Sequence, residues 1–185
     1  MHRRTLIHSL VALAALPLLP ACSRAAPGTA ALGTGAATGA ASAAAAGVTM
    51  LDHPDAYWRD KVSAAAYAVL FNEDTEPPGS SPLDDEKREG TFICAACQLP
   101  LFNSADKFDS GTGWPSFTRP IAGHMNTKRD FKLVWPRTEY HCARCGGHQG
   151  HVFNDGPRPR GERWCNNGLA LAFVPKGQPL PALRG

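Results

Sequence analysis

The sequence has no run or patch of basic residues. Its formal net charge is +3, but two of the contributing arginines, Arg3 and Arg4, lie in the N-terminal segment, and the charges of the remainder nearly cancel. Proteins that bind nucleic acid usually concentrate positive charge on one surface. The sequence therefore gives no sign of a nucleic-acid partner.

The sequence also has no apolar run long enough for a permanent membrane-spanning helix. The run from Leu10 to Leu19 falls well short of the roughly 20 apolar residues that such a helix needs. Because His2-Arg3-Arg4 precedes it, the segment 1–21 is instead typical of a signal peptide. We expect an exported protein, either periplasmic or anchored to a membrane and facing the periplasm.

Two export signals overlap in this segment, and the sequence leaves the choice open. Arg3-Arg4-Thr5-Leu6-Ile7 resembles a twin-arginine signal. Leu19-Pro20-Ala21-Cys22 resembles a lipobox, in which a lipidated Cys22 would tether the protein to a membrane, although Pro20 is unusual there. An ordinary cleaved signal with an incidental Cys22 is the third interpretation. Residues 22–47 consist almost wholly of Ala, Gly, Thr and Ser and predict a flexible tether.

Helical patterns are scarce after the tether. The 16 prolines and 18 glycines favour a loop-rich, mostly β domain, which we place at 48–178 and follow with a C-terminal tail at 179–185. One helix is expected, capped by Asp52 or Asp55 and continuing to about Phe71. Short strands are expected at 91–93, 133–135 and 138–141.

Cysteine is sparse, and four of the six residues form two Cys-x-x-Cys pairs, Cys94 with Cys97 and Cys142 with Cys145. Each pair can present two sulfurs to a tetrahedral ion, and together they complete a closed shell of four thiolates. We therefore predict one structural Zn²⁺ per chain. Disulfides, which an oxidising compartment would favour, are one alternative. A thioredoxin-like redox pair is another, although neither pair opens a helix in a βαβ unit.

Cys165 is left outside these pairs. Arg163 precedes it by two residues and Asn167 follows by two, so strand alternation would place all three side chains on one face. A thiol reacts as the thiolate, which a neighbouring guanidinium favours. Cys165 is therefore a candidate nucleophile, and the alternative is a buried cysteine that acts as a small apolar residue.

Aromatic residues are few outside the motif segments, and one such segment is Gly111-Thr112-Gly113-Trp114-Pro115-Ser116-Phe117. Its glycines permit tight backbone geometry, and Trp114 and Phe117 offer apolar faces that suit a thioether methyl group. The loop alone does not separate this role for Trp114 from a place in the core.

Two histidines, His148 and His151, follow the second cysteine pair. They could be metal ligands, acid–base groups or surface residues. Because further ligands for a second metal are not obvious in the sequence, we assign them to acid–base or hydrogen-bonding duty. The turn signal at 154–157 leads the chain back to Cys165, so both histidines could face that thiol across a hairpin.

These motifs, in this order, resemble the B class of peptide-methionine sulfoxide reductases, which is specific for the R epimer at sulfur. The resemblance covers about Tyr57 to Phe173. It implies a mostly β fold of two antiparallel sheets with a few peripheral helices and a four-cysteine zinc site. It also implies a nucleophile that attacks the sulfoxide sulfur and becomes a sulfenic acid, and a set of assisting groups. By resemblance, the nucleophile is Cys165, the groups that bind and help protonate the sulfoxide oxygen are His148, His151 and Asn167, the residue that favours the thiolate is Arg163, and the residue that packs against the substrate methyl is Trp114.

Two features depart from the family pattern. Many members carry a resolving cysteine where this chain has Thr112, and the folded domain has no other free cysteine to replace it. We therefore expect the sulfenic acid to be reduced directly by an external, thioredoxin-like thiol donor. Separately, we expect a monomer that acts on oxidised methionine-containing proteins. Asn166 stands at a usually apolar position, and Trp164 replaces the common Tyr. The competing interpretation is a non-catalytic zinc module that binds a partner through the Trp114 pocket.

Overall fold

The computed structural model describes residues 47–132 and 135–185, so the predicted signal peptide and nearly all of the tether lie outside the described residues. The elements in chain order are η1 (Asp55–Trp58), α1 (Ala64–Asn72), β1 (Gly90–Cys94), β2 (Pro100–Asn103), η2 (Ser104–Asp106), β3 (Lys107–Phe108), β4 (Ser116–Phe117), β5 (Met125–Asp130), β6 (Arg137–Cys142), β7 (His148–Phe153), β8 (Arg163–Asn166), η3 (Gly168–Ala170) and β9 (Leu171–Pro175).

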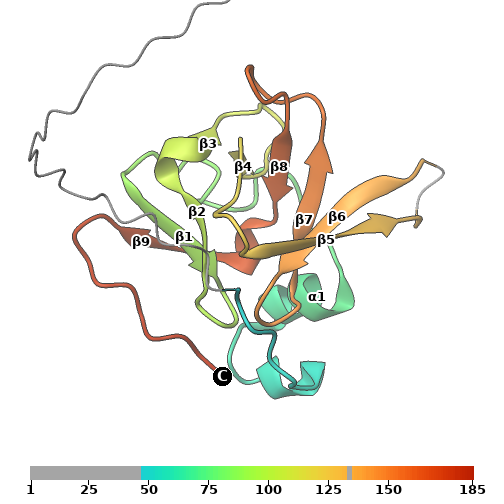
Figure 1. Cartoon of the computed structure of the whole chain (residues 1–185), viewed down its shortest axis with the longest axis vertical. Helices are drawn as coiled ribbons and strands as arrows, with labels where there is room; N and C mark the ends of the chain where they lie inside the picture. The colour runs from blue at the N-terminus through green and yellow to red at the C-terminus, as the bar shows by residue number, and fades with distance from the viewer. Residues whose placement is uncertain (1–46, 133–134) are drawn as a thin grey trace, which may run out of the picture. The chain divides into compact units, whose positions relative to one another are not determined.

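These strands form two antiparallel sheets, as the sequence predicted (Figure 1). The smaller sheet has the order β2-β1-β9, and the larger has the order β3-β4-β8-β7-β6-β5. The central strands of the larger sheet, β4, β8 and β7, come from three separate motif segments. Residues that are far apart in the sequence are thereby brought side by side.

Aromatic rings join the two sheets. Phe102 of β2 stacks on Phe117 of β4 with 4.0 Å between ring centroids, and Phe92 of β1 meets Phe117 edge-on at 5.0 Å. All three rings are fully buried. Burial of this kind is the main favourable term in folding, so this cluster fixes how β4, and with it the neighbouring β8, lies on the smaller sheet.

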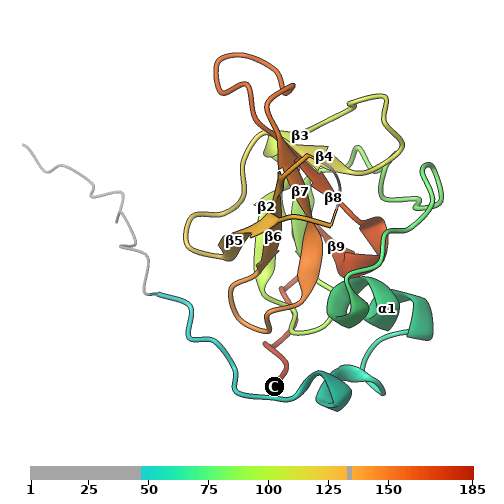
Figure 2. The ribbon, with the colours of Figure 1, turned by 90° about the vertical axis from the view of Figure 1, so that its right-hand side faces the viewer.

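The predicted single helix is two shorter elements, so that expectation was wrong. The helix α1 begins only after Ser63, whose Oγ accepts a hydrogen bond from the backbone N–H of Ala66 at 3.1 Å. This N-cap satisfies a backbone N–H group at the start of the helix. The sequence pattern had instead predicted that residues 60–62 lie inside the helix. Figure 2 shows α1 beside the lower ends of the sheets, where it contacts β7 and η3. Within the described ranges no helix is long and apolar enough to cross a bilayer.

The predicted C-terminal tail packs against both Cys-x-x-Cys turns. Arg184 donates its backbone N–H to the carbonyl of Cys97 at 3.0 Å and its guanidinium to the carbonyl of Ala96 at 3.0 Å. Arg144, in the other turn, donates to the carbonyl of Gly185 at 3.1 Å. The tail therefore supplies donors and acceptors to the two turns rather than extending from the domain.

Candidate active site and metal site

Cys165 lies at the centre of the larger sheet, on β8. Its neighbours across the strands are Ser116 on β4 and His151 on β7. The strands β7 and β8 approach closely because Gly150 lacks a side chain: a Cβ there would collide with the carbonyl oxygen of Cys165. The predicted hairpin is present, and His151 faces Cys165 across it.

A hollow of about 110 Å³ opens over Cys165. It is lined by Thr75, Trp114, Arg137, Gly150, His151, Phe153, Cys165, Asn166 and Asn167. Four of the predicted site residues thus meet in one place: Cys165, His151, Asn167 and Trp114. A larger hollow beside Lys61 and Arg184 contains none of the predicted site residues.

Burial raises the pKa of the Cys165 thiol above its ordinary value. Three groups oppose this effect and lower the pKa: the guanidinium of Arg163 and the hydroxyl groups of Thr112 and Ser116. Arg163 therefore acts in the predicted direction, but burial outweighs it. The guanidinium also makes two hydrogen bonds of 2.8 Å to the carboxylate of Asp155, whose negative charge offsets part of its own.

The rate at which iodoacetamide alkylates Cys165 is expected to depend on the charges of Arg163 and Asp155. Because the pKa is raised, little thiolate exists at pH 7, and the rate should keep rising through pH 9. Asp155→Asn frees the guanidinium of Arg163, lowers the pKa of Cys165 and should speed alkylation at pH 8 by about two- to tenfold, whereas Arg163→Gln should slow it by a similar factor. A rate that is flat above pH 7, or variants that shift it in the same direction, would contradict this reading of the site.

His151 is held by a carboxylate from the β5–β6 hairpin. Its Nε2 lies 3.0 Å from Oδ2 of Asp130, and the same oxygen accepts a hydrogen bond of 2.6 Å from Arg137. Burial lowers the pKa of His151, and the contact with Asp130 opposes this effect. A neutral imidazole held in one orientation beside a thiol can accept or return a proton.

His148 lies one layer deeper than His151, outside the hollow. It is 1% exposed, its ring centroid is 5.4 Å from that of His151, and its Nδ1 is 2.6 Å from Oε1 of Glu139. The same oxygen lies 3.1 Å from Nε2 of His141. Burial lowers the pKa of His148 to about 4, so the imidazole is neutral at pH 7. His148 therefore does not line the hollow, and its predicted contact with the sulfoxide oxygen stays a prediction.

Glu139, His141 and His148 also form a group whose ligand atoms lie within 4.8 Å of one another. The sequence had not indicated further ligands beside His148, and the fold supplies two of them from β6. Oε1 of Glu139 and Nδ1 of His148 are 2.6 Å apart, but neither atom makes a hydrogen bond with suitable geometry.

Glu76 is a buried residue that connects two of the predicted site residues, and sequence analysis missed it. Its backbone N–H donates to Oδ1 of Asn167 at 3.1 Å, and its carbonyl accepts from Nε1 of Trp114 at 3.1 Å. Its carboxylate accepts from the backbone N–H groups of Gly168 at 2.5 Å and Leu169 at 2.9 Å. Glu76 thereby orients the amide and the indole together. In the sequence it stands among prolines that break a helix, and nothing there signals these contacts over some 90 residues of chain.

Phe117 does not belong to the hollow, and we correct its assignment to substrate binding. Its ring is fully buried between Phe92 and Phe102. Along β4, Ser116 is paired with Cys165 and Phe117 with Trp164. Since neighbouring residues of a strand point to opposite faces, the residue beside Ser116 turns away from the thiol and into the core.

The four paired cysteines converge on one point. The sulfurs of Cys94 and Cys145 are 3.6 Å apart, those of Cys97 and Cys142 are 3.5 Å apart, and all four lie within 4.8 Å of one another. A disulfide would need about 2.05 Å, whereas four thiolates around a tetrahedral Zn²⁺ lie about 3.8 Å apart. Both turns follow strands, β1 and β6, and neither opens a helix. The donor set therefore fits a closed metal site and not a redox pair.

Comparison with known proteins agrees with this arrangement. The family model described as SelR domain matches residues 62–175. A peptide methionine sulfoxide reductase MsrB of Bradyrhizobium diazoefficiens is 49% identical over 120 residues, which are 64% of this chain and 86% of that protein. A protein of the same name from Agrobacterium fabrum is 45% identical over 122 residues, covering 65% and 90%. The chloroplastic peptide methionine sulfoxide reductase B1 of Arabidopsis thaliana is 43% identical over 115 residues, covering 62% and 57%.

Proposed function

Because the chain belongs to the SelR-domain family of peptide methionine sulfoxide reductases, we propose that it reduces the R epimer of peptide-bound methionine sulfoxide with Cys165 as the nucleophile. Family membership makes it an oxidoreductase that acts on methionine sulfoxide, with oxidised proteins as substrates. One observation carries the mechanistic proposal: Cys165, His151, Asn167 and Trp114 line the same small hollow.

The proposed reaction transfers one oxygen atom between two sulfurs. The sulfur of Cys165 attacks the sulfoxide sulfur, the sulfur–oxygen bond of the substrate breaks, and oxygen ends on Cys165 as a sulfenic acid. The methionine sulfur gains two electrons and the cysteine sulfur loses two. The thiol proton leaves Cys165 and returns on the oxygen, so no outside proton is consumed in this step.

The residues around the hollow suit this proton transfer. The raised pKa of Cys165 keeps its proton in the free enzyme, and the neutral His151 opposite can take it when the substrate arrives. Asn167 can then donate its amide to the oxygen, and Trp114 can pack against the methyl group. Asp130 holds His151 through a hydrogen bond, so the ring that faces the thiol has few alternative positions.

We infer an external reductant from the position of Thr112. Its hydroxyl lies close enough to the Cys165 thiol to lower that pKa, and the other cysteines among the described residues belong to the four-sulfur cluster. The sulfenic acid therefore has no resolving thiol beside it and would be reduced by a thioredoxin-like donor.

Thr112→Cys is expected to replace direct reduction by an external thiol with formation of an intramolecular disulfide. The new thiol would stand beside the oxidised Cys165 and form an intramolecular disulfide with release of water. After one turnover with excess peptide sulfoxide, mass spectrometry should find a 112–165 disulfide in the variant and a sulfenic acid at Cys165 in the parent, trapped with dimedone. Thr112→Ser is the matched control and should behave like the parent. A disulfide to Cys165 in the parent chain would contradict the inference.

The remaining proposals concern the cellular location of the protein and its metal ion. The predicted signal at 1–21 supports an exported protein, periplasmic or membrane-anchored, that repairs oxidised exported proteins, with Cys22 as the candidate lipid attachment site. We further propose that it acts as a monomer. The four-sulfur cluster supports Zn²⁺, held by Cys94, Cys97, Cys142 and Cys145. That ion would close the fold and take no part in the reaction, since four sulfurs leave it no open position.

An epimer-resolved assay tests the proposed activity. The purified protein, with dithiothreitol as the reductant, should reduce the R epimer of a peptide methionine sulfoxide and leave the S epimer unchanged. The competing function, a zinc module that binds a partner through the Trp114 pocket, predicts reduction of neither epimer by a folded, zinc-loaded sample.

A further inference from the structure

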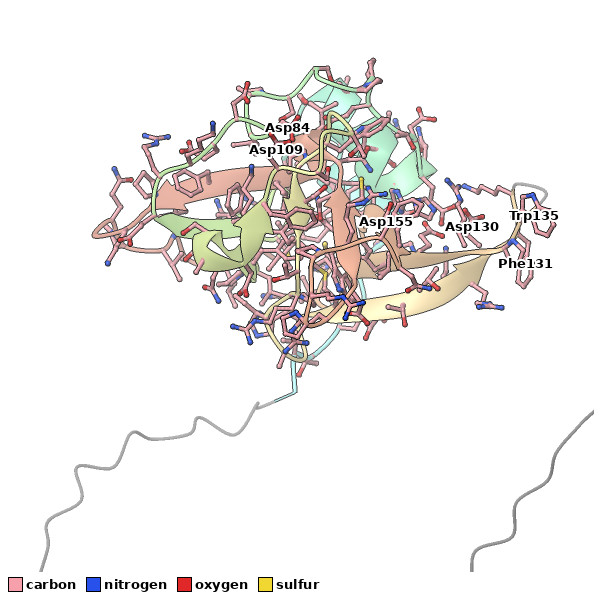
Figure 3. All side chains as sticks on the ribbon, turned by 90° about the horizontal axis from the view of Figure 1, so that it is seen from above. Asp84, Asp109, Asp130, Phe131, Trp135 and Asp155 are labelled. Atoms are coloured by element: carbon pink, nitrogen blue, oxygen red, sulfur yellow. The ribbon has the colours of Figure 1, made fainter. Side chains whose placement is uncertain are left out.

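The β5–β6 hairpin carries two exposed aromatic side chains beyond its last paired residues. Phe131 is 72% exposed and Trp135 is 81% exposed. The other large apolar side chains that the described residues leave exposed are aliphatic and lie elsewhere: Met50, Leu180 and Leu183. Figure 3 shows Phe131 and Trp135 together at the outer end of the hairpin. Apolar side chains gathered on a surface commonly mark an interaction site.

This aromatic tip is adjacent in the sequence to residues of the candidate active site. Phe131 directly follows Asp130, whose carboxylate contacts His151, and Trp135 stands two residues before Arg137, which lines the hollow over Cys165. Consecutive Cα atoms are 3.8 Å apart, so both rings lie within about 10 Å of residues that hold or line the site.

Several charges on the hairpin have ion-pair partners. Lys128 and Lys132 both contact the carboxylate of Glu73, at 2.6 Å and 2.5 Å, and Arg137 pairs with Asp130. The two lysines hold the pKa of Glu73 down to about 2, so these pairs persist at neutral pH. The pairs tie the hairpin to the end of α1, while Arg129 on the same hairpin is exposed and has no ion pair among the described residues. The two rings at the tip are the apolar part of this surface and suit the apolar side chains of a partner.

The volume of the hollow limits how much of a substrate protein can enter it. A volume of about 110 Å³ accepts one side chain and not the polypeptide around it. Residues on either side of an oxidised methionine must therefore rest outside the hollow. Methionine is an apolar core residue, and its oxidation disrupts cores, so the exposed segment around a sulfoxide is commonly apolar.

We propose that Phe131 and Trp135 form a docking platform for the apolar residues that flank the oxidised methionine in an unfolded or locally opened substrate protein. This inference rests on the proposed function. It assigns to the platform the recognition of the substrate chain, while the hollow recognises the sulfoxide itself. The platform should therefore matter for long apolar substrates and not for an isolated methionine sulfoxide.

The double variant Phe131→Ser/Trp135→Ser tests the platform in the full chain. Two substrates are compared: N-acetylmethionine R-sulfoxide methyl amide, and a 15-residue peptide with Leu and Val on both sides of the sulfoxide. We expect kcat/KM for the peptide to fall by about tenfold, through KM, because two exposed rings would be removed from the contact. For the small substrate the change should stay below about twofold. Met50→Ser/Leu180→Ser is the matched control and should leave both values unchanged.

Equal losses on the two substrates, or no loss on the peptide, would overturn the platform. So would a variant that keeps both rates but no longer sediments with phosphatidylglycerol vesicles, since the tip would then bind a membrane. If the parent protein reduces neither substrate, the proposed function fails and the platform fails with it. A parent that is active on the small substrate separates the two results.

Discussion

Cys142→Ser is expected to unfold the domain. The substitution removes one of four sulfurs from a closed site that joins the end of β6 to the end of β1, strands of different sheets. A structural Zn²⁺ in such a site supplies on the order of 10 kcal/mol of folding free energy. Whole domains are stable by about 5–15 kcal/mol, so the loss of most of the metal affinity leaves little or no net stability.

Zinc content and thermal unfolding check this result together. The parent should hold one Zn²⁺ per chain and unfold in one transition, and Cys142→Ser should lose both the metal and the transition. Chelation of the parent at high temperature should have the same effect. Cys165→Ser is the matched control, because it changes a cysteine outside the cluster and should keep metal and stability. A metal-free Cys142→Ser protein with parental stability would show that the cluster does not hold a structural ion.

The same control variant is expected to lose catalysis. Cys165→Ser replaces the attacking sulfur by a hydroxyl oxygen, which cannot form a sulfenic acid, so reduction of the R epimer should fall by at least about 10³-fold. The fold should be unaffected, because Cys165 is only partly buried and the two atoms are similar in size. Steady-state reduction with dithiothreitol measures the loss.

Two substitutions bracket the result. Thr112→Ser keeps a hydroxyl group beside the thiol and should retain most of the activity, which shows that the assay tolerates changes in the hollow. A folded Cys165→Ser protein with more than about a tenth of the parental rate would exclude Cys165 as the nucleophile and revive the binding-module interpretation.

Local signals in the sequence were sufficient for the sulfur cluster and the central hairpin, whereas the fold of two antiparallel sheets was implied by the family resemblance. Cys-x-x-Cys spacing determines that two sulfurs approach each other, and two such pairs predict a shared site, which the sulfur distances confirm. The turn signal at 154–157 predicted that the chain returns antiparallel, and the pairing of His151 with Cys165 confirms it. In these cases the physical cause lies within a few residues of the motif.

The predictions that failed depended on contacts between distant segments. Phe117 belongs to the core because its ring meets Phe92 and Phe102 of the other sheet, which the loop sequence does not reveal. Glu76 reaches its partners across some 90 residues of chain. None of these contacts leaves a periodic or short-range pattern.

A single-turnover experiment tests the central claim most directly. The reduced, zinc-loaded protein is mixed with excess R or S epimer of a peptide methionine sulfoxide, without a reductant, and methionine formed and free thiols lost are counted. The account predicts one methionine per chain from the R epimer, one reactive thiol lost at Cys165, a dimedone-reactive sulfenic acid and no new disulfide. Methionine formed without loss of the Cys165 thiol, or no methionine from either epimer, would contradict it.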